Sequence, residues 1–326
     1  MSICAIVKSV EKFPEESIKT LAEISRYDVA SAGGKGASLG EMLRAGLPIP
    51  AGFVILSRAF DSFLEETAMN VEIDAALAKV EYQEMHSVER AAEDIQALIL
   101  AAKMPKGFKK VLLEAFDLLG AEYVAVRSSA TAEDGASAAW AGQLDTFLNS
   151  SRKTLVRHVQ KCWASLFTAR AIFYRFENGL QQESISVAVV IQKMVDANKS
   201  GIAFSVHPVT EDKNQLIIEA GPGLGEAIVS GQITPDSYVV TKSPRKILDK
   251  KLTAHERGLF RKKGGGNEWR KTENNSEQLL EDDEILQLAD LVIKIEKHFG
   301  FPCDIEWAKE GKSLFFTQSR PITTLM

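Results

Sequence analysis

Alternating apolar and polar residues near the C-terminal end predict two β-strands joined by a short turn. The first strand contains Asp304-Ile305-Glu306-Trp307, and the second contains Leu314-Phe315-Phe316-Thr317-Gln318-Ser319-Arg320-Pro321. Glu306 and Gln318 offer the oxygen ligands that Mg²⁺ prefers, and the guanidinium group of Arg320 suits phosphate. The hairpin therefore indicates a site for a metal-bound nucleotide. The alternative is an exposed edge hairpin with scattered polar residues.

Parity along the two strands decides whether these polar side chains share a face. Residues two positions apart point the same way, so Gln318 goes with Arg320, and Asp304 goes with Glu306. The two pairs face each other only if the turn has an odd number of residues. We therefore predict a three-residue turn at 310–312, in which Gly311 supplies the positive φ.

The rest of the chain mixes helical and strand periodicity. Helices are predicted at 14–25 and 37–44, in a helical section at 58–119, and at 152–176 and 277–298. Strands are predicted at 52–56, 123–127, 186–195, 201–206, 215–219 and 238–241. The polar residues 242–276 predict a mobile surface loop. A boundary between two lobes is expected near residue 196.

Composition narrows the class of protein. The chain has 326 residues, of which 45% are hydrophobic and 25% are charged, and its formal net charge is −5. Neither nucleic acid nor an anionic membrane surface is an expected partner for such a balance. No apolar run is long enough to span a bilayer, and the first ten residues lack a secretory signal, so a soluble cytoplasmic protein is expected. The three cysteines show no CxxC spacing, which disfavours zinc and a disulfide framework.

A glycine-rich segment, Gly33-Gly34-Lys35-Gly36, precedes the predicted helix at 37–44. Glycines let backbone N–H groups approach an anion, the helix N-terminus adds a positive dipole, and Lys35 adds a charge. The spacing differs from the Walker motif, so a P-loop is excluded. The alternative is a plain turn with a solvated lysine.

A second basic position, Arg127, follows an apolar strand and precedes hydroxyl-bearing and small residues. It can neutralise phosphate oxygens, and the small-residue loop at 136–146 can close over them as a lid. The alternative is an ordinary turn and surface loop.

The end of the strand at 186–195 turns polar where the two lobes are expected to meet. Its backbone can offer N–H and C=O groups to a purine edge, with Met194 packing on the ring. Glu219 precedes a glycine-rich turn that lacks the dinucleotide-binding spacing, and it is expected to support the site. His207 is expected to be structural.

These motifs, in this order, resemble the ATP-binding domain of the phosphoenolpyruvate synthase and pyruvate phosphate dikinase family, which rifampin phosphotransferase and phenylphosphate synthase share. The resemblance rests on motifs spread over nearly the whole chain. They lie at 33–42 (GGKGASLGEM), 50–53 (PAGF), 126–134 (VRSSATAED), 141–149 (AGQLDTFLN), 223–226 (GLGE), 234–236 (TPD), 304–307 (DIEW) and 318–321 (QSRP).

The resemblance implies an α+β, ATP-grasp-like fold of two lobes, 1–196 and 197–326, with ATP in the cleft between them. It also implies roles for individual residues. Lys35, Arg127 and Arg320 would bind phosphates as catalytic cations, and Glu306 and Gln318 would hold Mg²⁺. The remaining ATP contacts would be Gly142, Gln143 and Thr146 in the loop over the phosphates, and Gln192, Lys193, Met194 and Val195 in the adenine pocket.

In this family the β-phosphoryl group of ATP passes to a histidine on a separate domain. The glycine-rich Ser/Thr-x-x-Ser-His motif of that carrier is absent from this sequence, and none of its five histidines has such surroundings. We therefore expect a phosphotransferase module that needs a phosphohistidine carrier, either as a subunit acting in trans or as part of a longer protein. The phosphoryl group would continue to pyruvate. The alternatives are another acceptor, such as a phenol or an antibiotic, and a non-catalytic nucleotide-binding regulatory subunit.

Overall fold

The computed structural model describes residues 17–131, 144–181, 185–272 and 277–322. The chain divides into two compact units. The first unit consists of Met1–Gly40 and Ala51–Met194, and the second consists of Glu41–Pro50 and Val195–Met326. The division passes through helix α2 (Val29–Arg44), between Gly40 and Glu41.

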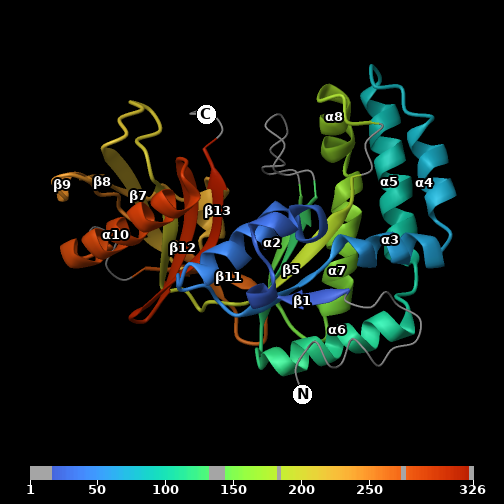
Figure 1. Ribbon diagram of the computed structural model, residues 1–326, viewed down its shortest axis with the longest axis horizontal. Helices are drawn as coiled ribbons and strands as arrows, with labels where there is room; N and C mark the ends of the chain where they lie inside the picture. Colours follow the sequence, from blue (N-terminus) through green and yellow to red (C-terminus); the bar gives the residue numbers. More distant parts are fainter. Residues whose placement is uncertain (1–16, 132–143, 182–184, 273–276, 323–326) are drawn as a thin grey trace. The chain divides into compact units, whose positions relative to one another are not determined.

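A five-stranded antiparallel sheet forms the centre of the first unit (Figure 1). Its strands are β1 (Ile18–Thr20), β2 (Gly52–Ile55), β3 (Val124–Ala130), β4 (Thr146–Ser150) and β5 (Val187–Lys193). They lie in the order β1-β2-β5-β3-β4, so β5 occupies the middle, and all its residues except Lys193 are buried. The strands predicted at 52–56, 123–127 and 186–195 are confirmed. β3 continues past Arg127 to Ala130, and β4 is an additional strand that the periodicity does not predict.

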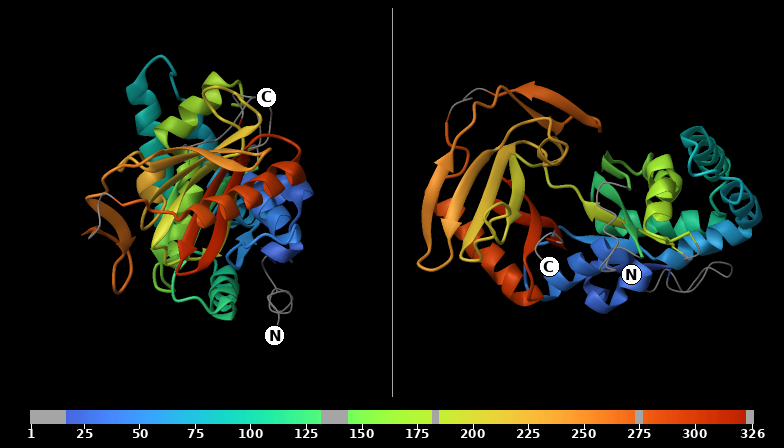
Figure 2. Two further views of the ribbon diagram at one scale, coloured as in Figure 1. Left: turned by 90° about the vertical axis from the view of Figure 1, so that its left-hand side faces the viewer. Right: turned by 90° about the horizontal axis from the view of Figure 1, so that it is seen from above.

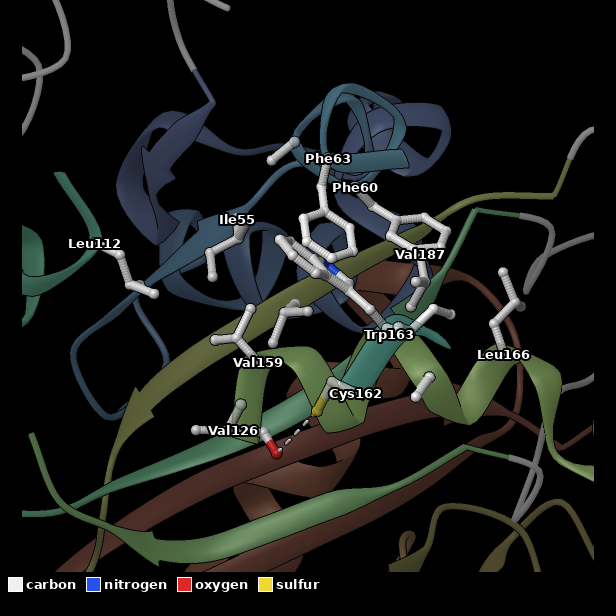
Figure 3. Close-up of a cluster of buried hydrophobic side chains, with 14 of the residues drawn as sticks. Ile55, Phe60, Phe63, Leu112, Val126, Val159, Cys162, Trp163, Leu166 and Val187 are labelled. Carbon is white, nitrogen blue, oxygen red and sulfur yellow. Dashed lines mark hydrogen bonds between the residues drawn. The ribbon is translucent and has the colours of Figure 1, made fainter. Parts of the chain in front are cut away.

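Helices enclose a hydrophobic core against one face of this sheet. They are α3 (Ser57–Glu66), α4 (Asn70–Leu77), α5 (Met85–Ala101), α6 (Lys106–Leu119), α7 (Leu155–Ala164) and α8 (Ala169–Glu177). Trp163 lies at the centre, with its ring 4.9 Å from that of Phe63 and 5.6 Å from that of Phe60 (Figure 3). Val126 and Val187 join this cluster from the sheet. The helical section predicted at 58–119 is confirmed. Its helices cover one face of the sheet and leave the opposite face for other elements.

The N-terminal helix predicted at 14–25 is wrong over the part that the structure describes. β1 pairs with β2, and two 3-10 turns follow, η1 (Leu21–Glu23) and η2 (Arg26–Asp28). Both turns carry capping boxes, in which Thr20 with Glu23 and Ser25 with Asp28 bond each other's backbone. Side chains that bond the nearby backbone compete with a continuous helix, which explains the difference.

The long helix predicted at 152–176 is broken in two. α7 ends at Ala164, a 3-10 turn (η3, Ser165–Phe167) follows, and α8 begins after Thr168. Thr168 has extended backbone angles, and its side chain accepts a hydrogen bond from the Ala171 N–H. A threonine N-cap in the middle of an apolar stripe therefore starts a new helix where periodicity alone suggests continuation.

A six-stranded antiparallel sheet forms the centre of the second unit, in the order β13-β12-β6-β7-β8-β9. Its strands are β6 (Lys199–Phe204), β7 (Gln215–Pro222), β8 (Asp236–Thr241), β9 (Lys246–Lys251), β12 (Cys303–Glu310) and β13 (Ser313–Pro321). The strands predicted at 201–206, 215–219 and 238–241 are confirmed, as is the C-terminal hairpin. A one-turn helix, α9 (Glu226–Val229), follows β7.

The two faces of this sheet differ in burial. Helix α10 (Asp282–Phe299) contacts β7, β8 and β12 (Figures 1 and 2). Its Glu284 forms ion pairs with Lys199 and Lys309, which identifies the face that it covers. Ile305 and Trp307 lie on that face and are almost completely buried. Asp304 and Glu306 alternate with them, so they lie on the other face, and both are only half-buried.

The mobile surface loop predicted at 242–276 is wrong. This segment contains β9, at the edge of the six-stranded sheet, and the separate β10–β11 ribbon. The ribbon consists of β10 (Arg257–Arg261) and β11 (Asn267–Lys271), joined by a glycine-rich turn. The half-exposed strands of this segment need few apolar residues, so their polar composition resembles that of a loop.

Candidate functional site

Helix α2 is kinked at Gly33 and rests on β3 in the first unit. Gly33 has φ 69° and ψ 170°, so the predicted turn is a single residue within a helix that begins at Val29. A Cβ atom at Gly33 would lie 2.2 Å from Ser129 Oγ, and the Gly36 N–H donates a hydrogen bond to that oxygen at 3.3 Å. Only glycine allows this approach together with a positive φ. The kink therefore places half-buried Lys35 in the turn that follows the contact with β3.

Arg127 lies on the face of the sheet that α2 occupies. Ser129 is two residues further along β3, so it shares the face of Arg127. Val54 and Arg127 are both paired with Val190, and a Cβ atom at Gly36 of α2 would lie 3.4 Å from Val54 Cγ2. The helical core lies on the opposite face. α2, with its Lys35, therefore packs on the face that carries Arg127.

A buried pair, Arg127 and Gln192, lies on the same face. The two residues are 6% and 2% exposed, and Arg127 Nη1 donates a hydrogen bond to Gln192 Oε1 at 3.4 Å. Gln192 Nε2 is buried and has no hydrogen-bond partner among the described residues. A buried amide nitrogen without an acceptor costs free energy, about 1–3 kcal/mol. This geometry suits a site in which a bound molecule supplies the missing acceptor.

Thr146 is paired with Arg127 across β3 and β4, so their side chains share a face. The residue predicted at the end of a lid loop is thus the first residue of a strand. Gly142 and Gln143 lie outside the described residues, as does most of the loop at 136–146. The structure thus brings Arg127, Thr146 and Gln192 together on the α2 side of the sheet.

The segment predicted to contact a purine leaves β5 at the end of the first unit. The Lys193 N–H donates to the Ala51 carbonyl at 2.8 Å, and the Met194 N–H donates to the Tyr123 carbonyl at 3.1 Å. These two N–H groups are therefore occupied, and the predicted purine contact would depend on other groups of the segment. Val195, the last residue of the prediction, belongs to the second unit.

The C-terminal hairpin has a two-residue turn, and the prediction of a three-residue turn is wrong. Glu310 pairs with Ser313, so only Gly311 and Lys312 lie between the strands. The register then shifts at a β-bulge, because Trp307 pairs with Phe316 while Glu306 pairs with Gln318. Thr317 is the extra residue. The bulge moves the register by one and so restores the parity that an odd turn would have provided.

As a result of the bulge, the predicted metal ligands do share a face. Glu306 lies directly opposite Gln318, and Asp304 lies directly opposite Arg320. In the other direction Glu306 pairs with Ile202, which pairs with Glu219. Residues paired across neighbouring strands share a face, so Glu219 lies on the face of the hairpin's polar residues, away from α10. Burial raises the pKa of Glu219, and the nearby Asp304 adds to the shift.

An ion pair that the residue pattern alone did not reveal joins the two ends of this hairpin. Arg320 donates to Asp304 Oδ2 from Nε at 2.8 Å and from Nη2 at 2.7 Å. Burial raises the pKa of Asp304, and the guanidinium of Arg320 opposes that shift. The alternation of residues along the first strand already predicts that Asp304 and Glu306 share a face. The ion pair between Asp304 and Arg320 could not be predicted, because it depends on the register between the two strands.

The donor set suits Mg²⁺ better than a metal held by protein alone. Within the described residues, no group of three His, Cys, Asp or Glu side chains is arranged to hold an ion. A carboxylate such as Glu306 with an amide oxygen such as Gln318 is the kind of partial set that Mg²⁺ completes with water and substrate phosphates.

The buried thiols of Cys162 and Cys303 are poor nucleophiles and metal ligands, because burial raises the pKa of each to about 12. No helix in the described ranges is long and apolar enough to cross a membrane.

Comparison with known proteins finds relatives along nearly the whole chain. The family model described as "Pyruvate phosphate dikinase, AMP/ATP-binding domain" matches residues 29–326. The "Probable phosphoenolpyruvate synthase" of Methanocaldococcus jannaschii is 41% identical over 329 residues, which cover 98% of this chain and 28% of that protein. The protein with the same description in Archaeoglobus fulgidus is 44% identical over 318 residues, covering 94% of this chain and 41% of that protein.

A relative with a different acceptor in its name is also found. The "Rifampicin phosphotransferase" of Bacillus subtilis is 37% identical over 311 residues, which cover 94% of this chain and 36% of that protein. The chain therefore spans less than half the length of each of these relatives.

Proposed function

Because the chain belongs to the family of the pyruvate phosphate dikinase AMP/ATP-binding domain, we propose that it binds Mg²⁺·ATP and positions the β-phosphoryl group for transfer to a histidine. The observation that carries the proposal is the buried pair of Arg127 and Gln192, with an amide nitrogen that has no acceptor among the described residues. The buried Gln192 amide nitrogen is costly without an acceptor, and a nucleotide supplies acceptors as well as phosphates that suit the neighbouring guanidinium group.

The cations would supply the main catalytic effect. Phosphoryl transfer needs little covalent help from the protein, so positioning and charge neutralisation dominate. Lys35 and Arg127 would neutralise phosphate oxygens from the first unit, with Thr146 beside them. Gln192 Nε2 would donate to the nucleotide, and the segment up to Val195 would line the adenine.

Glu306 and Gln318 would hold Mg²⁺ in the second unit, with phosphate and water oxygens completing its coordination. When bound there, Mg²⁺ would supply charge neutralisation for the phosphate oxygens. Arg320 would bind phosphate beside it.

A phosphohistidine carrier would complete the reaction: its histidine nitrogen would bond to the β-phosphorus, the bond from that phosphorus to the α-phosphate oxygen would break so that AMP leaves, and the γ-phosphoryl group would pass to a second acceptor such as water. The relatives are longer than this chain, and the carrier motif is absent from this sequence, so the histidine would lie on another domain or on a partner subunit. The final acceptor would be pyruvate, as the names of most relatives suggest. A phosphotransferase for another acceptor, as in the Bacillus subtilis relative, would use this module unchanged.

The test is transfer of label from ATP. The protein is mixed with Mg²⁺, ATP labelled in the β-phosphate and a purified carrier domain bearing the glycine-rich histidine motif. We expect acid-labile, base-stable label on the carrier, loss of that label in Lys35→Ala, and normal labelling in Arg152→Ala, which removes an exposed arginine outside the site. ATP binding without labelling would favour a nucleotide-binding regulatory subunit, and absence of ATP binding would overturn the proposal.

The two amide side chains assigned to the nucleotide and the metal make a second, independent prediction. Gln192→Ala in the first unit and Gln318→Ala in the second should each weaken Mg²⁺·ATP binding measured by calorimetry. Unchanged binding in either variant would exclude the role proposed for that residue.

A further inference from the structure

The ion pair between Asp304 and Arg320 differs from an ordinary surface pair in its burial. The side chain of Asp304 is 13% exposed and that of Arg320 is 47% exposed. The carboxylate of Asp304 is thus the less exposed half of the pair, and the guanidinium group is the half that solvent reaches more readily. Exposed pairs contribute little to stability, so a partly buried carboxylate kept beside a solvent-facing arginine calls for another explanation.

The geometry of the pair leaves one edge of the guanidinium group available. Both hydrogen bonds come from the Nε–Nη2 edge and converge on a single oxygen, Asp304 Oδ2. Nη1 has no acceptor among the described residues, and the edge formed by Nη1 and Nη2 can receive a planar or tetrahedral anion. Arg320 lies next to Gln318 along the face on which the proposed metal ligands are placed.

The backbone explains why the two residues meet. Asp304 and Arg320 are directly opposed only because the bulge at Thr317 sets the register of this end of the hairpin. The same shift sets Glu306 opposite Gln318. One feature of the strand therefore aligns both the proposed metal ligands and the pair beside them.

We propose that Asp304 is a positioning residue that holds Arg320 by one edge, so that the other edge is aimed at the phosphates of ATP. This inference rests on the proposed function and goes beyond it, because Asp304 itself need touch neither nucleotide nor metal. An arginine that is already oriented loses less side-chain entropy on binding, which strengthens its contact with phosphate.

The charge of Asp304 acts in the opposite direction, and the two effects can be separated. A carboxylate beside the phosphates repels them, so removing its charge alone should strengthen binding slightly. Losing the orientation of Arg320 should weaken binding. Since both bonds go to one oxygen, the amide oxygen of Asp304→Asn can accept them, whereas Asp304→Ala cannot.

The experiment measures equilibrium binding of Mg²⁺·ATP and of AMP to the whole chain by calorimetry. We expect Asp304→Ala to weaken ATP binding about tenfold, with less than a twofold effect on AMP, which lacks the β- and γ-phosphates. Asp304→Asn should restore most of the ATP affinity. In the Arg320→Ala background, Asp304→Ala should add less than a twofold effect, because a positioning residue has nothing left to position.

A matched control comes from the first unit. Asp117 of α6 accepts hydrogen bonds from Nε and Nη2 of Arg152, in the turn before α7, at 2.6 and 2.9 Å, and both side chains are about half exposed. Asp117→Ala removes a comparable pair and should leave ATP binding unchanged.

Three results would overturn the inference. Unchanged ATP binding in Asp304→Ala would show that Arg320 needs no such anchor. A full tenfold loss that persists in the Arg320→Ala background would show that Asp304 acts by another route. In both cases wild-type binding would leave the proposed function standing. Failure of the wild-type protein to bind ATP would instead remove the proposed function and this inference together.

Discussion

The bulge at Thr317 makes a sharp prediction about two single-residue deletions. Deleting Thr317 removes the extra residue, so Phe316 and Gln318 become neighbours and alternate faces as a regular strand requires. Every pair of the hairpin is kept, including Glu306 with Gln318. We expect the variant lacking Thr317 to bind Mg²⁺·ATP within about threefold of wild type. Its free energy of unfolding should fall by about 1 kcal/mol, because the contacts that Thr317 makes in the bulge are lost.

Deleting Ser319, two positions away, also makes a regular hairpin possible, but at the expense of the site. If the C-terminal end of β13 keeps its register, Gln318 moves into the position of Ser319, which is 5% exposed on the face covered by α10. If the part of β13 nearer the turn keeps its register, Arg320 moves into that position instead. One of the two proposed ligands is lost in either case.

The magnitude follows from what the buried face must accept. An amide without a partner costs about 1–3 kcal/mol there, and a side chain larger than serine in a packed position costs about 1–3 kcal/mol more. We therefore expect deletion of Ser319 to lower the free energy of unfolding by about 2–6 kcal/mol. Loss of a metal ligand or of a phosphate-binding arginine should weaken Mg²⁺·ATP binding at least tenfold.

The assay combines urea unfolding, followed by circular dichroism, with calorimetric titration of Mg²⁺·ATP into each folded variant. The two deletions remove residues of similar size and polarity from one strand, so each is the control for the other. Equal ATP affinities in the two variants would refute the reasoning from parity. So would complete loss of binding in a folded variant lacking Thr317.

Three further changes test other parts of the molecule. Gly33→Ala should destabilise the protein by about 2–4 kcal/mol in urea unfolding, because its Cβ would overlap Ser129; Gly46→Ala, with a similar φ of 70° but nothing within 4 Å, should cost only about 1 kcal/mol. Burial alone would raise the pKa of Asp236, but hydrogen bonds, foremost that from His255, lower it, so its contribution to stability is present above pH 3.8 and is lost as the pH falls further. Asp236→Asn should therefore lower stability by about 3 kcal/mol at pH 7 and reduce the loss on acidification, whereas an unchanged pH profile would contradict this assignment. Lys35→Ala should abolish phosphoryl transfer with an unchanged unfolding curve, and normal transfer would exclude its proposed role.

Local chemistry predicted much of the architecture. The buried run of β5 and the helical stripes between 58 and 119 follow from apolar periodicity, because burial of one face is a local requirement of each element. The glycine-rich segment before Lys35 also predicted a break in the chain direction, because glycine is the residue that a kink or turn with a positive φ requires. Composition failed where strands carry little apolar surface, as in β9, β10 and β11.

What the sequence determined by itself is the inventory of the candidate site: a lysine after a glycine kink, an arginine and a glutamine on buried strands, and a carboxylate, an amide and an arginine on the last hairpin. Only the tertiary structure decided which of them meet. The register of the hairpin depends on a bulge at Thr317, and the pairing of Arg127 with Gln192 depends on strands far apart in sequence. Such pairings are set by the packing of whole sheets against their helices, which no local pattern of residues contains.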